Sequence, residues 1–335
     1  MNHIAIDLGA SKSQICVRDP QGKIIEEKHL ETAKLAGYLK RRSTSRVIME
    51  TCSESWRISD AAQEAGHEVR VVPGHLVRSL GVGHRQMKSD RKDAQALSEV
   101  STRIDLPSVH LRSRESREIQ TRLKMRSQLV SSRTQLINNV RGWMRTEAIR
   151  LRTGSVPTFT KRLRAKKKEV GLPFYVERQL EQIDALTQAL VSTEEELEEL
   201  AQETSGIAIL KSVPGVGTLT ALAFMATIDQ LDRFRKAHHL QSYLGLTPGE
   251  RSSGNKQRST SITKAGSSML RYLLIQASWT LYVHRPQEPI VLWAKKIEKR
   301  RGKKIAIVAL ARKLAGILFA IWKTKRPYQP KLTSG

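Results

Sequence analysis

The sequence predicts an α/β domain followed by a mainly helical region. Over residues 1–110, short β-branched apolar runs alternate with segments of helical period. Two long heptad patterns occupy residues 111–205, and apolar helical stretches dominate residues 206–335. The chain has 335 residues, which is enough for two or three domains. We therefore expect an α/β domain, a coiled-coil helical arm and a helical C-terminal domain with these boundaries.

The N-terminal block begins with three strands in hairpin order. Residues 3–7 and 14–19 are strand-like, and residues 20–22 (Pro-Gln-Gly) mark a turn before a third run at 23–30. Helical and strand-like segments then alternate, which predicts a mixed sheet. The helical segments are residues 32–42, 53–66 and 88–101, and the later strand-like segments are residues 45–52 and 67–74.

The net charge is strongly positive and unevenly placed. The formal charge at neutral pH is +26. Such an excess says little about fold, but it predicts a polyanionic partner, most simply nucleic acid. By segment, the net charge is +3 for residues 1–110, +13 for 111–175, −8 for 176–205 and +18 for 206–335. The basic arm and the basic C-terminal domain are therefore the expected contact regions.

Membrane and secretory classes find little support. The longest apolar stretch, residues 305–322, is interrupted by Arg312 and Lys313, so we expect no membrane span and no membrane partner. Asp7 interrupts the N-terminal apolar run, so we expect no signal peptide. Cys16 and Cys52 are the only cysteines, which indicates a reducing compartment without a disulfide framework. We therefore expect a cytoplasmic protein.

Two heptad patterns predict the arm. In the first helix one heptad position is apolar and its companion is mixed with arginine; the second helix is acidic. The two helices could pair with each other as an antiparallel coiled coil, or they could contact a second copy. The first helix has Leu123, Val130, Ile137 and Met144 with companions Ile119, Arg126, Arg133 and Val140, and the second has Val176, Ile183, Leu190 and Leu197 with companions Leu186 and Leu200.

Four carboxylates could form one metal site. Asp7 and Glu50 lie near the ends of strands, and strands that end side by side can bring their last side chains together. Asp90 and Asp93 are three residues apart in a helix, so they share one face. Four such acids in one cleft would repel one another unless hard cations such as Mg²⁺ bound between them. Two ions about 4 Å apart can activate an attacking oxygen and stabilise a leaving one.

Two alternatives bear on these acids. Asp90 and Asp93 could instead pair with neighbouring cations on a solvated helix. The opening strand with Asp7 is also typical of actin-type ATPases and sugar kinases, which repeat an acidic residue near glycines in a second domain. No Asp after residue 110 is followed by Gly within two positions. A nuclease of the RNase H type, in which the same Asp holds a metal ion, therefore fits better than a kinase.

A glycine-containing turn precedes an apolar helix in the C-terminal domain. Residues 214–217 (Pro-Gly-Val-Gly) lead directly into it. Gly215 and Gly217 let the backbone approach a phosphate, and the helix N-terminus offers free N–H groups. The turn resembles the helix-hairpin-helix motif, which grips DNA backbone without reading sequence. An ordinary corner in the core is the alternative, and the basic surroundings favour DNA contact.

Residues 243–274 are rich in Ser, Gly, Lys and Arg before they become an apolar helix. We expect a polar, cationic loop around Ser252 and Ser253. This loop could bind phosphate without chemistry, or it could carry a serine nucleophile that nearby cations activate. Spacing alone separates neither these two roles nor the two serines.

The ordered set of motifs resembles the DEDD transposases of bacterial insertion sequences, which are bridge-RNA-guided recombinases with a RuvC-like domain. The set covers about residues 3–325: Asp7, Glu50, Asp90-x-x-Asp93-Ala94, the heptad region, the PGVG turn and "GLTPxxxxSG…ITKAG…LR". One departure is visible, because the family has Asn after a Gly where this chain has Gly266 followed by Ser267.

The resemblance implies a fold, a reaction and partners. It implies an RNase H-like (RuvC-like) N-terminal domain whose four acids bind Mg²⁺, and a helical transposase domain. The family's serine before Gly, which matches Ser253 here, becomes covalently joined to DNA during recombination. The family also binds a structured guide (bridge) RNA whose loops pair with target and donor DNA. It works as a multimer, so we expect a homo-oligomer, dimer or tetramer, associated with the bacterial nucleoid.

We therefore expect an RNA-guided DNA recombinase or transposase. The alternatives are an Mg²⁺-dependent junction resolvase that hydrolyses DNA and a non-catalytic nucleic-acid-binding protein with degenerate acids. The expected catalytic residues are Asp7, Glu50, Asp90, Asp93 and Ser253, of which the four acids would ligate the metal. The expected nucleic-acid-binding residues are Lys161, Arg162, Arg164, Lys166, Lys167, Lys168, Gly215, Gly217, Arg251, Lys256, Arg258, Lys264 and Arg271.

Overall fold

The structure is a computed structural model that describes residues 1–79, 90–166, 171–253 and 256–330. It divides into two compact units, Met1–Arg112 and Ser113–Gly335. The first unit ends close to the boundary expected at residue 110. The residues expected to form a separate arm and a separate C-terminal domain share the second unit.

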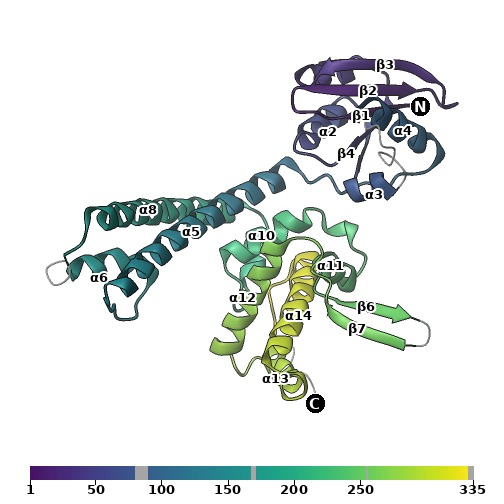
Figure 1. The fold of residues 1–335 in the computed structure, drawn as a ribbon. Coiled ribbons are helices and arrows are strands. Elements are labelled where there is room, and N and C mark those ends of the chain that lie inside the picture. Colours follow the sequence, from purple (N-terminus) through teal and green to yellow (C-terminus); the bar gives the residue numbers. More distant parts are fainter. Residues whose placement is uncertain (80–89, 167–170, 254–255, 331–335) are drawn as a thin grey trace. The chain divides into compact units, whose positions relative to one another are not determined.

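The first unit is built on one five-stranded sheet (Figure 1). The strand order is β3-β2-β1-β4-β5, with antiparallel pairing among the first three and parallel pairing of β4 with β1 and β5. The predicted mixed sheet, with three strands in hairpin order, is confirmed. The strands are β1 (Asn2–Asp7), β2 (Lys12–Arg18), β3 (Ile24–Glu31), β4 (Ser45–Glu50) and β5 (Glu68–Val72).

Both faces of this sheet are covered by helices. Ile4 and Ile6 of β1 belong to an apolar cluster with residues of α1 and α2. Ala5, between them, points to the other face and joins a second cluster that includes Leu97 of α4. This alternation follows from the pleat, which sends successive side chains to opposite faces. The helical elements are η1 (Thr32–Lys34), α1 (Leu35–Lys40), α2 (Ser55–Glu64), α3 (Gly74–Ser79) and α4 (Asp90–Arg103).

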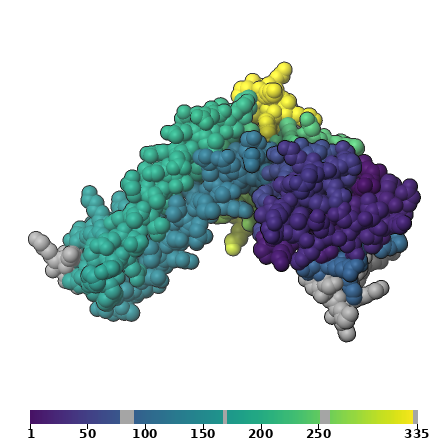
Figure 2. Space-filling model, turned by 90° about the horizontal axis from the view of Figure 1, so that it is seen from above, coloured from purple at the N-terminus to yellow at the C-terminus, as the bar shows by residue number. Residues whose placement is uncertain are grey.

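The arm is an antiparallel pair of long helices within one chain. α5 (Arg114–Thr146) and α8 (Phe174–Glu203) lie against each other along most of their length (Figures 1 and 2). η2 (Val156–Thr158) and α6 (Phe159–Ala165) lie between them in the chain, and α6 packs on α8. At the start of α5, Ser113 accepts a hydrogen bond from the Ser116 N–H at 3.1 Å and lies 2.6 Å from an Asp229 carboxylate oxygen.

Two polar layers set the register of this pair. Arg126 forms an ion pair with Glu194, and Arg133 donates to Thr187 at 3.4 Å. Because the helices are antiparallel, moving seven residues back along α5 from Arg126 and seven forward along α8 from Glu194 pairs Ile119 with Ala201. The opposite move, from Arg133 and Thr187, pairs Val140 with Leu180. The residues of each pair belong to one apolar cluster.

The companion position predicted for the first helix is therefore confirmed. In the second helix, the residues that face it lie one position after the predicted companions, although Leu200 still packs against an apolar cluster. Burial does not separate the two sets, because Leu186, Leu200 and Thr187 are all half-buried and Glu194 is exposed; the cross-helix contacts do. The residues that fill the position are Leu180, Thr187, Glu194 and Ala201.

The difference between the predicted and the observed companions lies in the choice between two possible steps along the helix. The two positions of a heptad are separated by alternating steps of three and four residues. From Ile183 the step of three reaches Leu186, whereas the step of four reaches Thr187, which faces Arg133. The sequence of one helix does not show whether the residue three or four positions further on contacts the partner helix. That depends on how the two helices pack.

The remainder of the second unit is a helical bundle with one β-hairpin (Figure 1). Its main apolar cluster includes residues of α5, α8, α10, α12 and α14. α14 is long and apolar enough to cross a membrane by length and composition alone, but half of its apolar window is buried inside the protein, as in a core helix. The elements are α9 (Ile207–Lys211), α10 (Thr218–Ile228), η3 (Leu231–Arg233), α11 (Ala237–Tyr243), β6 (Pro248–Ser253), β7 (Lys256–Ile262), α12 (Ser268–His284), α13 (Pro289–Arg301) and α14 (Lys303–Thr324).

The polar loop expected around Ser252 and Ser253 is instead a two-stranded ribbon. β6 and β7 pair antiparallel from Pro248 opposite Ile262 to Ser253 opposite Lys256. Few apolar residues alternate with polar ones in these strands, so the usual strand signal is missing. The sequence between the strands, Gly-Asn, is nevertheless a pair that favours two-residue hairpin connections.

Candidate active site and nucleic-acid interface

Asp7 and Glu50 leave the sheet at the same end and on the same face. β1 and β4 are parallel neighbours, with Ala5 opposite Ile48. Ala5 and Ile48 both belong to the apolar cluster that includes residues of α4. Because side chains alternate between faces, Asp7 and Glu50, each two residues further along its strand, project from that same face. The strand register therefore makes these two carboxylate-bearing positions neighbours.

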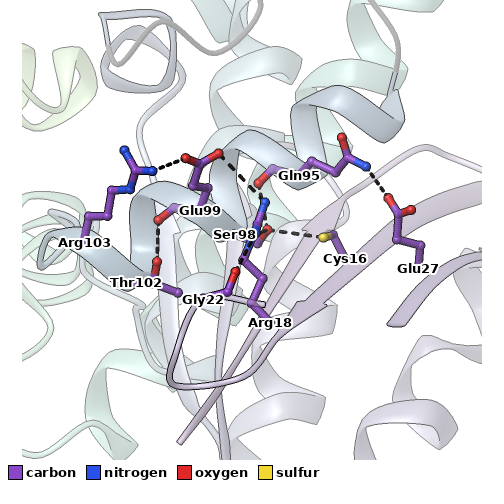
Figure 3. A network of polar contacts seen from close by, with 9 residues as sticks. All are labelled: Cys16, Arg18, Gly22, Glu27, Gln95, Ser98, Glu99, Thr102 and Arg103. Carbon is purple, nitrogen blue, oxygen red and sulfur yellow. Dashed lines mark hydrogen bonds and ion pairs between the residues drawn. The ribbon is translucent and has the colours of Figure 1, made fainter. Parts of the chain in front are cut away.

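Polar contacts hold α4 over this face (Figure 3). Ser98 Oγ lies 3.3 Å from Cys16 Sγ and accepts a hydrogen bond from Arg18 Nε at 2.9 Å. Arg18 also donates to the Gly22 carbonyl at 2.7 Å and lies 3.8 Å from the Glu99 carboxylate. Burial raises the pKa of the Cys16 thiol, so this cysteine stays protonated and acts as part of the packing.

The direction of α4 follows from a further contact. His3 Nδ1 lies 2.8 Å from Ser101 Oγ, so the last turns of α4 lie over the start of β1. The helix from Ser101 back to Asp93 spans about 12 Å, and the strand from His3 to Asp7 spans about 13 Å. Asp93 is therefore carried to about the level of Asp7, with Asp90 one turn beyond it. Across the strands, however, the start of α4 is tied to β3, because Arg91 and Gln95 both donate hydrogen bonds to Glu27. β3 lies on the opposite side of β1 from β4, which carries Glu50.

The four side chains do not themselves form a ligand cluster. Among the residues that the structure describes, no three Asp, Glu, His or Cys side chains gather closely enough to hold a metal ion. Glu50 is exposed and its carboxylate lies against Gly74, where even an added methyl group would overlap it. Asp7 and Asp93 are half-buried, and Asp90 is exposed. The predicted donors are all carboxylates, which suit a hard divalent cation better than a soft one.

Ser253 stands at the end of β6, beside residues 254–255, which lie outside the described part of the chain. The hairpin register brings the backbones of three predicted cations close to the two serines. The pairs are Ser253 with Lys256, Ser252 with Gln257 and Arg251 with Arg258.

Lys264 and Arg271, which follow the hairpin, are hydrogen-bonded to the segment that precedes it. The Lys264 N–H donates to the Gly245 carbonyl at 3.1 Å, and Arg271 donates to the Leu244 carbonyl at 3.3 Å. Gly245 has a φ of +65° and lies so close to the next segment that a Cβ would overlap its backbone. The Arg271 side chain therefore has a hydrogen-bond partner within the protein, whereas the Lys264 side chain is exposed.

Ser267, the departure from the family pattern, has a clear structural position. It is the N-cap of α12, and its side chain accepts a hydrogen bond from the Leu270 N–H at 3.2 Å. Ser and Asn are about equally favourable at helix N-caps, because each side chain can accept from the first free backbone N–H groups. A serine here therefore preserves the start of α12.

Gly215 and Gly217 of the predicted phosphate-binding turn have different surroundings. Gly215 has a φ of +83°, and a Cβ there would overlap the Ala277 carbonyl of α12. This glycine is therefore required by packing. Gly217 is exposed, caps α10, and a Cβ there would meet no atom within 4 Å. Only the second glycine lies at an open surface.

A carboxylate from the arm lies at the same turn. Glu198 of α8 accepts a hydrogen bond from Thr218 Oγ1 in the first turn of α10, and Lys211 forms an ion pair with it at 2.5 Å. The hydrogen bond from Lys211 lowers the pKa of Glu198, so this carboxylate is ionised at neutral pH. A cleft of about 440 Å³ here is also lined by Glu194. A carboxylate that is paired with Lys211 therefore already bonds the first turn of α10, where a phosphate was expected. The sequence carries no sign of this contact because the residues come from different helices.

The basic run of the arm is partly occupied by internal contacts. Arg164 forms ion pairs with Glu177 and Asp184 of α8. Arg162 donates to the Ser155 carbonyl at 3.2 Å and to Thr158 Oγ1 at 3.1 Å. Lys161 is exposed and Lys166 is half-buried, and Lys167 and Lys168 lie outside the described residues.

An α/β unit with Asp7 and Glu50 on one sheet face, and a strongly basic helical unit whose strand β6 ends at Ser253, fit the class of nucleic-acid-processing enzymes. Comparison with known families agrees. A transposase family model of the DEDD, IS110 type matches residues 4–147. The model of the transposase IS116/IS110/IS902 family matches residues 207–290.

Similarity to individual proteins extends over nearly the whole chain. The transposase for insertion sequence element IS1111A of Coxiella burnetii is 30% identical over 334 residues, covering 97% of this chain and 91% of the relative. A probable family 20 transposase of Pseudomonas aeruginosa is 27% identical, covering 98% and 99%. A pilin gene-inverting protein of Moraxella bovis is 25% identical, covering 87% and 84%. The chain therefore belongs to the IS116/IS110/IS902 transposase family and is an enzyme of the DNA recombinase and transposase class.

Proposed function

We propose that this transposase cuts and rejoins DNA through a serine-linked intermediate. The observation that carries the proposal is the range of its relatives, which includes proteins named as transposases and a protein named as pilin gene-inverting. Moving an element and inverting a segment both require that cut DNA ends be kept and rejoined. A covalent bond between protein and DNA keeps an end, whereas hydrolysis releases it. A recombinase that rejoins DNA is therefore favoured over a nuclease that only hydrolyses it.

We assign the metal ligands to Asp7, Glu50, Asp90 and Asp93 in an RNase H-like domain. The DEDD transposase family is generally metal-dependent. The shared sheet face of β1 and β4 and the direction of α4 support this assignment. When bound, two Mg²⁺ ions would supply charge stabilisation for the phosphate and a lower pKa for the attacking hydroxyl. The chain contributes rigid elements on which the acids are mounted.

We assign the nucleophile to Ser253. In the proposed step, Ser253 Oγ forms a bond to a DNA phosphorus while the bond from that phosphorus to one sugar oxygen breaks. The serine hydroxyl loses its proton and the departing sugar oxygen gains one. Attack by a hydroxyl of another strand then restores a DNA phosphodiester and frees the serine. The cations Arg251, Lys256 and Arg258 would stabilise negative charge on the phosphoryl oxygens.

The remaining expectations concern partners. We propose that the protein binds a structured guide RNA and assembles as a homo-oligomer, dimer or tetramer, in which different copies can complete one site. The net charge of +26 supports nucleic-acid partners in general. Lys161 and Lys264, whose side chains are exposed, are better placed for phosphate than Arg162, Arg164 and Arg271, which have internal partners.

The matched pair Ser253→Ala and Ser252→Ala tests the nucleophile. Radiolabelled DNA carrying the ends of the element is incubated with the full chain, its RNA and Mg²⁺. We expect a covalent adduct with the natural protein and with Ser252→Ala, and none with Ser253→Ala. Protease digestion and mass spectrometry would locate the attached nucleotide. An adduct on Ser252 would contradict the assignment, and free cleaved ends without any adduct would support the nuclease instead.

The acids are tested in the same assay. Asp7→Asn and Asp93→Asn should abolish cleavage while leaving DNA binding largely intact. Asp232→Asn, which changes an exposed acid in the other unit, is the matched control and should cleave normally. Normal cleavage by both Asp7→Asn and Asp93→Asn would remove the metal-site assignment.

A further inference from the structure

The turn between α13 and α14 carries the densest cluster of exposed cations in the last three helices. Residues 295–304 contain seven Lys and Arg and one acid. We call this segment the basic corner. Gly302, with a φ of +82°, ends α13 and directly begins α14, so the two helix ends meet at one residue. Six of the seven cations are exposed: Lys296, Lys299, Arg300, Arg301, Lys303 and Lys304.

These cations have no carboxylate partner among the residues that the structure describes. Between residues 268 and 325, Glu288 and Glu298 are the only acids in the sequence. Both are already engaged, since Glu298 accepts a hydrogen bond from the Tyr282 hydroxyl and Glu288 lies 3.4 Å from the Tyr328 hydroxyl. Lys303 lies over the rings of Trp279 and Tyr282 at 5.5 and 5.0 Å, a contact that leaves its positive charge in place.

Helix stability explains only part of this cluster. The helix dipole favours Lys299, Arg300 and Arg301 in the last turn of α13, but not the cations that follow Gly302. Ile290, Val291 and Ala294 bury one side of α13, while Lys296, Lys299 and Arg300 share an exposed side at spacings of three and four. Like charges at these spacings destabilise a helix.

The first turn of α14 points to the same conclusion. It carries Lys303 and Lys304 and no acid. Cations at a helix N-terminus oppose the helix dipole. The repulsion between neighbouring cations and the cations at the start of α14 are unfavourable for folding, and such charges are expected where they meet an external anion.

We infer that the basic corner, residues 295–304, is a contact surface for the phosphate backbone of DNA. The inference rests on the proposed function, because it takes the polyanion to be the DNA on which a transposase acts. Contacts of this kind fix the protein on the duplex without reading sequence. The surface is separate in sequence from both the serine hairpin and the four acids, so it holds DNA rather than reacting with it.

Charge neutralisation in the full chain tests the inference. The corner variant changes Lys296, Lys299, Arg300 and Lys304 to Gln. The matched control changes four exposed cations of the first unit, Lys23, Lys28, Lys40 and Arg41, to Gln. Both variants lose the same charge, and far-UV circular dichroism establishes that both are folded. Binding to a short fluorescein-labelled DNA duplex without element sequence is measured by anisotropy, from about 50 to 200 mM salt.

We expect the corner variant to bind DNA at least about tenfold more weakly at the middle of this range. Its salt slope should be reduced by roughly three to four, near 0.9 for each of the four lost contacts. The control should change far less. Equal slopes for the corner variant and the control would overturn the inference while leaving the proposed function standing. Failure of the natural protein to bind DNA at all would overturn both. A loss seen only with an RNA hairpin of matched length would assign the corner to RNA and overturn the assignment to DNA.

Discussion

Residues 161–166 in the arm and residues 295–304 at the basic corner are both dense in Lys and Arg, but their side chains are used differently. In the arm, Arg162 and Arg164 are held by oxygen atoms of the protein itself. At the corner, six cations are exposed and lack carboxylate partners within the described residues. Arg164 has carboxylate partners because α6 packs on an acidic helix, whereas α13 and α14 contain a single acid between them. A count of basic residues therefore does not measure the charge available to a ligand.

The largest contrast between the two regions should appear in stability. Leu163 lies between the two arginines of the arm and is fully buried, whereas Ile305 beside the corner is 47% exposed. Leu163→Ala should lower the free energy of unfolding by about 2–5 kcal/mol, because it removes buried methyl groups and leaves a cavity. Ile305→Ala should cost less than about 1 kcal/mol. Urea unfolding followed by circular dichroism measures both, and equal costs would mean that α6 is not anchored as the structure shows.

A smaller contrast concerns the arginines themselves. Arg164→Gln should destabilise the arm by about 1 kcal/mol, a value reduced by solvent because the partners are partly exposed. Arg300→Gln at the corner should leave the melting temperature unchanged and weaken DNA binding instead. A double-mutant cycle with Asp184→Asn isolates the ion pair. If Arg164→Gln weakened DNA binding without lowering stability, the arginine of the arm would act on DNA like the corner cations, and the contrast between the two regions would be wrong.

The smallest effect depends on pH. Arg91 is an exposed arginine that, like Arg164, has a carboxylate partner, and its hydrogen bond lowers the pKa of Glu27 below the ordinary value of 4.5. The folded pKa lies below the unfolded one, so the pair stabilises the fold above about pH 4.5 and this contribution is lost as the pH falls through the folded pKa. The difference in melting temperature between the natural protein and Glu27→Gln should therefore shrink on acidification below about pH 4.5. The corner cations have no such carboxylate among the described residues. A difference in melting temperature between the natural protein and Glu27→Gln that did not change with pH would contradict the assigned ion pair.

The sequence predicted the elements well because their signals are local. A short apolar run identified β1, and the heptad pattern with its Arg126 and Arg133 positions identified the arm. Neighbour relations between distant elements carry no local signal. The adjacency of Asp7 and Glu50 on one face required the register of β1 with β4, and the partners of Arg164 required the docking of α6 on α8.

The same limit applies to the candidate site. The glycines at 215 and 217 look equivalent in sequence, yet packing against α12 explains only the first. The Glu198 carboxylate reaches the start of α10 from another helix, so no spacing rule could reveal it. The β6–β7 ribbon was not predicted because its strands are polar and lack apolar alternation, although the Gly-Asn pair between them was a usable turn signal.

The two polar layers of the arm also constrain how its length can change during evolution. Arg126 faces Glu194 and Arg133 faces Thr187, so an insertion in α5 alone would slide every later residue past its partner. Seven residues added to each helix at the same layer, about one heptad, would preserve all the pairings. Each such paired insertion would carry α6 outward by about 10 Å while leaving the start of α5 and the end of α8 unchanged. Within a family of this architecture, arm length should therefore vary in steps of one paired heptad.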